Sequence, residues 1–105
     1  MNYEQYPLLN SFSQCDDGSW HAEDIKSAIR KSGITLRGLC ERYDLPYGSV
    51  SKAISQPLKK GELAITDYLG VPVQLLFPTR WTVDGQRVRP RYADKYTTVA
   101  EYLSC

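Results

Sequence analysis

The stretch LCERYDLPYGSVSKAI, residues 39–54, constrains the fold more than any other part of this chain. It starts with helical apolar spacing, breaks at Asp44-Leu45-Pro46, and resumes with a short segment that again places apolar residues every three or four positions. Two short helices joined by so tight a turn must touch at fixed positions. The spacing predicts a helix-turn-helix over residues 36–55. Its helices are predicted to touch through Leu39, Leu45, Val50 and Ala53.

Two further residues of this stretch suit the helix crossing and the turn of such a motif. Cys40 is small where the two helices should cross most closely, and a free cysteine behaves as a small hydrophobe. Asp44 stands at the turn position that usually needs a left-handed backbone, which Asp tolerates better than most residues other than Gly. Such a turn holds the second helix away from the body, so that its exposed side can enter a major groove.

The outward side of the second helix, predicted to run over residues 46–55, is small and polar, as suits contacts with base edges and phosphates. The predicted base-reading residues are Tyr47, Gly48, Ser49, Ser51, Lys52 and Ser55. Basic residues around this helix are the predicted phosphate contacts, namely Arg37, Lys59, Lys60 and Arg80. The predicted partner is therefore a double-stranded DNA operator, because phosphate neutralisation supplies most non-specific affinity for DNA.

Other function classes fit the residues less well. A helix-turn-helix also occurs in proteins that bind no DNA, so an antitoxin-like or anti-repressor interaction module stays open as the alternative. Its mark would be an apolar exposed patch on the second helix, where the sequence has Ser and Lys. With His21 the only histidine and three widely spaced cysteines, we expect no enzyme, no metal site and no cofactor.

The charge is unevenly distributed along the chain. The net charge of +1 hides an acidic first segment, residues 1–19, which has three acidic and no basic residues. Residues 20–81 have nine Lys or Arg against six Asp or Glu, so the basic excess lies where the helices are predicted. Without an apolar run of membrane-spanning length or a signal-peptide pattern, we expect a cytoplasmic protein at the bacterial nucleoid and no membrane partner.

Helical periodicity continues on both sides of the motif. A helix is predicted from Trp20, capped by Ser19 and ended by Gly33, and Thr35 is the predicted cap of the next one. A later helix is predicted over residues 61–69, and a short one between Pro72 and Pro78. The predicted apolar set of the 61–69 helix is Leu63, Ala64, Ile65, Tyr68 and Leu69.

The two ends of the chain have a different texture. We expect an irregular arm over residues 1–19, a helix-turn-helix domain over 20–81 and an extension over 82–105. In the extension, Asp84-Gly85 predicts a hairpin turn. An apolar stripe predicts a terminal helix that packs on its own domain or pairs with a second copy in a homodimer; it consists of Tyr92, Tyr96, Val99 and Leu103. Residues 1–19 and 90–105 are expected to be dispensable for folding.

Residues 20–81 resemble the Ner repressors of Mu-like transposable phages and their bacterial Ner-like (Nlp) relatives. The resemblance rests on WH at the start of the first helix, LRGLCERYDLPYGSVSKAI, KKGELAI and the closing LLFPTRW. It implies an all-α, lambda-repressor-like fold of about five helices, and sequence-specific operator binding that usually represses transcription. By position, the resemblance places the base-reading surface at residues 47–52 and Ser55.

Overall fold

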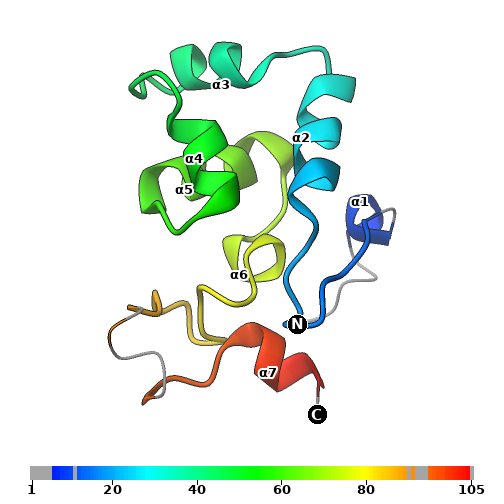
Figure 1. Cartoon of the computed structure of the whole chain (residues 1–105), viewed down its shortest axis with the longest axis vertical. Coiled ribbons are helices and arrows are strands. Elements are labelled where there is room, and N and C mark those ends of the chain that lie inside the picture. Colours follow the sequence, from blue (N-terminus) through cyan, green and yellow to red (C-terminus); the bar gives the residue numbers. More distant parts are fainter. Residues whose placement is uncertain (1–5, 11, 90, 92–94, 105) are drawn as a thin grey trace. The chain divides into compact units, whose positions relative to one another are not determined.

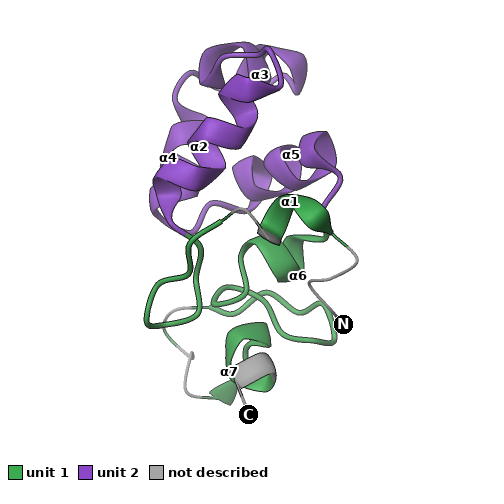
Figure 2. Cartoon of the chain, turned by 90° about the vertical axis from the view of Figure 1, so that its right-hand side faces the viewer, with its two compact units in different colours: residues 1–20, 72–105 green, residues 21–71 purple. Residues whose placement is uncertain are grey.

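The computed structural model describes residues 6–10, 12–89, 91 and 95–104. The chain divides into two compact units, coloured separately in Figure 2: unit 1 comprises residues 1–20 and 72–105, and unit 2 comprises residues 21–71. These boundaries differ from the predicted ones, because residues 72–81 group with the tail and not with the helix-turn-helix. Regular structure in the described residues is helical, and extended pairing there is limited to isolated bridges. The predicted all-α class is confirmed.

Residues 20–81 contain the expected five helices, α2 to α6. The first of them, α2 (Ala22–Lys31), buries Ile25 and Ile29 on one face and carries acidic residues in its first turn. The predicted Ser19 cap is wrong, because His21 is the N-cap residue of α2. Ser19 is engaged elsewhere: its backbone N–H donates to the Asp17 carboxylate at 2.9 Å. Hydrogen bonds from Ser19 to this carboxylate lower the pKa of Asp17.

The turn of the motif follows α3 (Leu36–Arg42), whose predicted cap Thr35 accepts a hydrogen bond from the Gly38 N–H at 2.9 Å. Asp44 adopts the predicted left-handed backbone, with φ of 56°. Its N–H donates to the Glu41 carbonyl at 3.2 Å, and the Leu45 N–H donates to the Cys40 carbonyl at 2.8 Å. This pair of bonds is a Schellman motif, which satisfies carbonyls that the end of α3 leaves unpaired.

The second helix of the motif, α4 (Ser49–Ser55), begins later than predicted (Figure 1). Pro46 and Tyr47 precede it in the connecting turn, and Gly48 is its N-cap residue with φ of 82°. A left-handed backbone cannot belong to a right-handed helix, so the predicted start at residue 46 or 47 is wrong. Val50, Ala53 and Ile54 are buried on the inner face of α4, as predicted.

The helix α5 (Lys59–Leu69) also packs closely against α4 and helps to hold it in place. A Cβ atom at Gly61 would lie 2.5 Å from the Ala53 Cβ and 2.8 Å from the Ser49 carbonyl oxygen, so only glycine allows this approach. The helix predicted over residues 61–69 starts earlier than predicted, because α5 begins at Lys59. The buried Glu62 carboxylate accepts a hydrogen bond from the Leu58 N–H at 2.8 Å and thereby caps the earlier first turn.

The predicted apolar set of α5 is correct only in part. Ala64 and Ile65 are buried, but the Leu63 side chain is 41% exposed. Gly70 ends the helix with φ of 71°, the left-handed backbone that a C-terminal glycine commonly adopts.

Unit 1 contains α1 (Pro7–Asn10), α6 (Val73–Leu76) and α7 (Val99–Ser104). The expected irregular arm is therefore partly helical. It also packs: Leu9 is buried, and a Cβ at Gly18 would lie 2.8 Å from the Ala100 Cβ. The short helix predicted between Pro72 and Pro78 is confirmed as α6.

Two tryptophans and the predicted hairpin turn also belong to unit 1. The Trp20 indole N–H donates to the Leu75 carbonyl at 2.8 Å, and Trp81 is buried. The turn at Asp84-Gly85 is confirmed by an isolated antiparallel bridge between Trp81 and Arg87.

The terminal helix begins later than the apolar stripe that predicted it. Tyr96 precedes α7, and Val99 is fully buried, while Tyr92 lies outside the described residues. Within the described parts of the chain, none of the helices combines the length and the apolar character needed to cross a bilayer.

Candidate nucleic-acid interface

Of the four residues through which the two helices were predicted to touch, three are fully buried, and Leu45 in the turn is half-buried. Leu39, Val50 and Ala53 are fully buried, and Cys40 is nearly so. The Val50 backbone N–H donates to the Cys40 sulfur at an N···S distance of 3.5 Å, so the cysteine joins α3 to the first turn of α4. With its inner face anchored in this way, α4 keeps its other side at the surface of unit 2.

That outer side is polar along α4 and aromatic just before it. Ser51, Lys52 and Ser55 are exposed, and the Tyr47 side chain is 83% exposed. Gly48 is half-buried in the turn. The predicted outward position of Ser49 is only partly correct, because Ser49 is half-buried and its carbonyl oxygen lies on the side of α4 that approaches Gly61.

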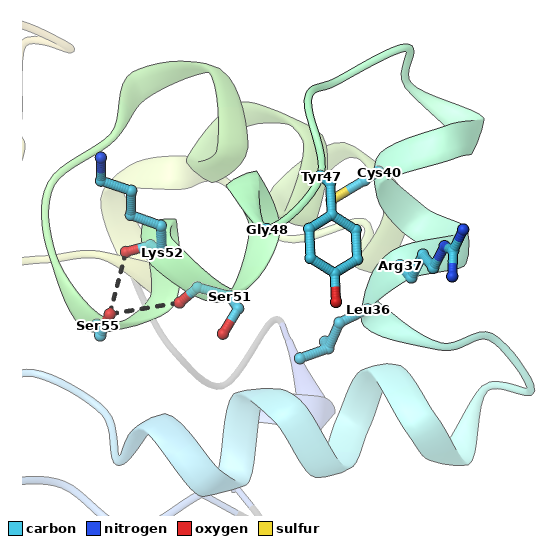
Figure 3. Close-up of a pocket in the computed structure, with 8 residues that line it drawn as sticks. All are labelled: Leu36, Arg37, Cys40, Tyr47, Gly48, Ser51, Lys52 and Ser55. Atoms are coloured by element: carbon cyan, nitrogen blue, oxygen red, sulfur yellow. Dashed lines mark hydrogen bonds between the residues drawn. The ribbon is translucent and has the colours of Figure 1, made fainter.

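A groove of about 570 Å³ opens between α3 and α4 on this side of unit 2 (Figure 3). It brings together six of the predicted contact residues and two others. Its lining residues are Leu36, Arg37, Cys40, Tyr47, Gly48, Ser51, Lys52 and Ser55. Leu36 and Cys40 are the two that the sequence reasoning did not assign to the site, although their spacing of four residues along α3 places them on one helix face.

Arg37 is held at the edge of this groove by two neighbours. Its guanidinium lies 5.6 Å from the centroid of the Tyr47 ring, a cation–π distance, and its Nε is 3.5 Å from a Glu41 carboxylate oxygen. Both side chains of the Arg37–Glu41 ion pair are largely exposed, so solvent screens it strongly. A phosphate oxygen could therefore compete with Glu41 for this guanidinium.

The other predicted phosphate contacts lie outside the groove lining. Lys59 and Lys60 are exposed in the first turn of α5, within unit 2. Arg80 belongs to unit 1, where it is half-buried and its guanidinium lies 4.7 Å from the centroid of the Phe77 ring. The structure thus places three of the four predicted cations, Arg37 among them, in the same unit as α4.

A tyrosine–carboxylate contact supports the far end of α3. The Tyr43 hydroxyl donates to the Asp67 carboxylate of α5 at 2.7 Å, and this hydrogen bond raises the pKa of Tyr43. Tyr43 is the C-cap residue of α3, directly before the turn. The contact therefore ties the turn of the motif to α5, the same helix that packs against α4.

A compact helical unit with an anchored helix-turn-helix and a polar outer side on its second helix defines a DNA-binding protein of the helix-turn-helix class. Residues 19–93 match the family model described as winged helix-turn-helix DNA-binding. The chain belongs to this family, among its Ner-like members, as the sequence resemblance indicated.

Three curated relatives illustrate the similarity. The Mu-like prophage FluMu DNA-binding protein Ner of Haemophilus influenzae is 26% identical over 89 residues, which cover 85% of this chain and 98% of the relative. A negative regulator of transcription from an Escherichia phage is 31% identical over 62 residues, 59% of this chain and 85% of the relative. Sugar fermentation stimulation protein B of Escherichia coli is 32% identical over 62 residues, 59% of this chain and 67% of the relative. No solved structure matches the chain.

Proposed function

We propose that this protein represses transcription by binding a specific duplex operator, with α4 reading base edges in the major groove. The observation that carries the proposal is the groove beside α4, where an anchored helix presents Ser51, Lys52 and Ser55 outward and Tyr47 stands at its entrance. Short hydroxyl side chains and a lysine can contact base edges at close range. The negative sign of regulation is supported by one relative's name, a negative regulator of transcription.

Within this proposal the predicted contact residues have two different tasks. The base-reading residues are Tyr47, Gly48, Ser49, Ser51, Lys52 and Ser55. The phosphate contacts are Arg37, Lys59, Lys60 and Arg80, which position the protein without reading sequence. No catalytic step is part of the proposed function, and its proposed location is the nucleoid in the bacterial cytoplasm.

The sequence left a protein-interaction module open as the alternative. Its expected mark was an apolar patch on the exposed side of the second helix. The exposed residues of α4 are instead Ser51, Lys52 and Ser55, which favours a hydrated, charged partner such as DNA.

Titration of DNA binding against salt tests the proposal. If the four proposed phosphate contacts, Arg37, Lys59, Lys60 and Arg80, neutralise four phosphates, the slope of log affinity against log salt concentration should be about −3.6. Selection of bound sites from random duplexes should yield a defined sequence, and a reporter under that sequence should be expressed less when the protein is present. A slope near zero together with no enriched sequence would refute DNA binding. Enrichment without lower reporter expression would refute only the repressor role.

We also propose that the protein binds its operator as a homodimer. Helix-turn-helix dimers read two half-sites about 34 Å apart, one turn of DNA, so the selected sequence should be a two-fold repeat at that spacing. Of the predicted tail stripe, Val99 is fully buried in unit 1, which favours packing of the stripe on its own unit over a role in the dimer. Sedimentation of the chain with one operator duplex tests this; one protein per duplex contradicts the dimer.

A further inference from the structure

We propose that the groove between α3 and α4 takes the C5-methyl group of a thymine, so that the operator is read there by an apolar contact with a specific base. This inference rests on the proposed function and names the base that the site selects. Its starting point is the mixed character of the groove, whose floor is apolar and whose rim is cationic.

The floor is built from groups that form no strong hydrogen bonds. Leu36 contributes its aliphatic side chain from the first position of α3. Cys40 lies one helical turn further on, nearly fully buried, and its sulfur already accepts the Val50 N–H. The Tyr47 ring adds an aromatic surface at the entrance.

The position of Tyr47 is set by its neighbours on both sides. Gly48 follows it with a φ of 82°, which fixes the chain direction between the turn and α4. In Figure 3 the Tyr47 ring lies between Arg37 of α3 and Ser51 of α4. The Arg37 guanidinium, 5.6 Å from the ring centroid, restrains the ring by a cation–π contact.

The rim decides which kind of partner fits the groove. Arg37 and Lys52 line it, and Lys59 and Lys60 are exposed in the same unit. An apolar peptide would gain contacts with the floor but would supply no anion for Lys52, Lys59 and Lys60. A DNA duplex provides phosphates for the rim and an exposed base edge for the floor at the same time.

Among the base edges in the major groove, only thymine presents an apolar group. Guanine and adenine expose N7 and O6 acceptors or an N6 amino donor there, and cytosine has its N4 amino donor and only a hydrogen at C5, where thymine carries the methyl group. Against Leu36 and Cys40 such groups would lose hydrogen bonds to water without replacement, which is unfavourable. The methyl group of thymine loses none, and it gains contact with the Tyr47 ring.

Changes of a single chemical group in the DNA test this inference. Each thymine of the selected operator is replaced in turn by deoxyuridine, which removes only the methyl group. At one thymine per half-site, affinity should fall about fourfold, the effect expected for burial of one methyl-sized group. Replacement of the same thymine by 5-bromodeoxyuridine, whose bromine is close to a methyl group in size, should restore the affinity.

A matched pair of protein variants locates the contact. Tyr47→Ala should bring the thymine-to-uracil affinity ratio at that position close to one. Because Tyr47 is 83% exposed, we expect this variant to fold like the parent protein. Tyr102→Ala, which removes another exposed tyrosine from α7 in unit 1, should leave the ratio unchanged. These two results together would support the methyl contact in this groove.

The failure of this inference is distinguishable from failure of the proposed function. An operator that binds with the expected salt slope but tolerates uracil everywhere, or has no fixed thymine, overturns the methyl contact and leaves DNA binding in place. A uracil-sensitive thymine that keeps its effect in Tyr47→Ala overturns the assignment to this groove. Absence of any enriched duplex overturns the proposed function itself.

Discussion

Asp44 occupies the most restrictive backbone position of the motif. Its left-handed φ of 56° is one that glycine adopts without strain and other L-residues adopt at a cost. We therefore expect Asp44→Gly to raise the free energy of unfolding by about 0.5–1 kcal/mol, since relief of strain outweighs the added entropy of the unfolded chain. Denaturant titration measures this. Asp44→Ala, which keeps the strain and loses the tolerant side chain, should lower the unfolding midpoint; a lower midpoint for Asp44→Gly would contradict the argument.

Reading and positioning by single residues can be separated experimentally. Ser51→Ala or Lys52→Ala should shrink the affinity gap between operator and random DNA, because a good base contact contributes roughly 1–3 kcal/mol of discrimination. Lys59→Ala should weaken binding to both DNAs and leave the gap nearly intact, since phosphate contacts carry no sequence information. Titration of each variant with both duplexes at one salt concentration is the measurement. An unchanged gap in both α4 variants would remove α4 from the reading role.

The sequence predicted individual residues well where the motif fixes their spacing, and less well elsewhere. Asp44 and Cys40 follow from spacing alone, because the distance along the chain to the turn determines their environment. Leu36 was missed as part of the groove because its half-exposed position depends on how α3 crosses α4. Ser49 was predicted to face outward, but it is half-buried at the end of α4 where the backbone approaches Gly61 of α5.

At the scale of elements, the contact between α4 and α5 is the tightest in unit 2. A methyl group at Gly61 would overlap both the Ala53 side chain and the Ser49 carbonyl. Gly61→Ala should therefore destabilise the protein by about 1–3 kcal/mol, the range typical of overpacking. Lys60→Ala, one residue away and exposed, should change stability by less than about 0.5 kcal/mol. Thermal unfolding of both variants compares them directly; equal midpoints would mean that α5 can shift without loss.

Helix boundaries were the least predictable elements, and each error has a local cause. The α4 start depends on the left-handed Gly48, which sequence alone does not reveal. The α5 start depends on the Glu62 side chain, which caps Leu58 from inside the helix. The α7 start depends on Thr98, whose hydroxyl oxygen accepts the Glu101 N–H at 3.2 Å. Several residues close together could each start the same helix. Apolar periodicity does not show which of these possible starts the chain uses.

At the scale of the whole molecule, the described residues of the arm and of the tail group with residues 72–89 in unit 1. That both segments are dispensable for folding stays a prediction, and the contacts of the tail within unit 1 restrict it to unit 2. The Val99 N–H donates to the Trp81 carbonyl at 2.9 Å, and the Ala100 N–H donates to the Pro78 carbonyl at 3.0 Å. A chain that ends at Arg89 loses these bonds and the buried Val99.

We expect this truncation to lower hydrogen-exchange protection in residues 72–89 and to preserve it in residues 22–71. The reason is that the helices of unit 2 pack through contacts of their own, such as those of Ile29, Leu39 and Ile65. Exchange measured by mass spectrometry on peptides from both units gives the comparison. An equal loss of protection in residues 22–71 would show that unit 2 depends on the tail.

The glycine contact between α4 and α5 has a consequence for how such proteins diverge. Because α4 is anchored entirely through its inner face and through the backbone at Ser49, its outer side chains carry none of the packing. If α4 reads the operator as proposed, substitutions there change the sequence that is recognised and leave the scaffold unchanged. Duplicated copies of such a gene would then be free to acquire separate targets on one common scaffold.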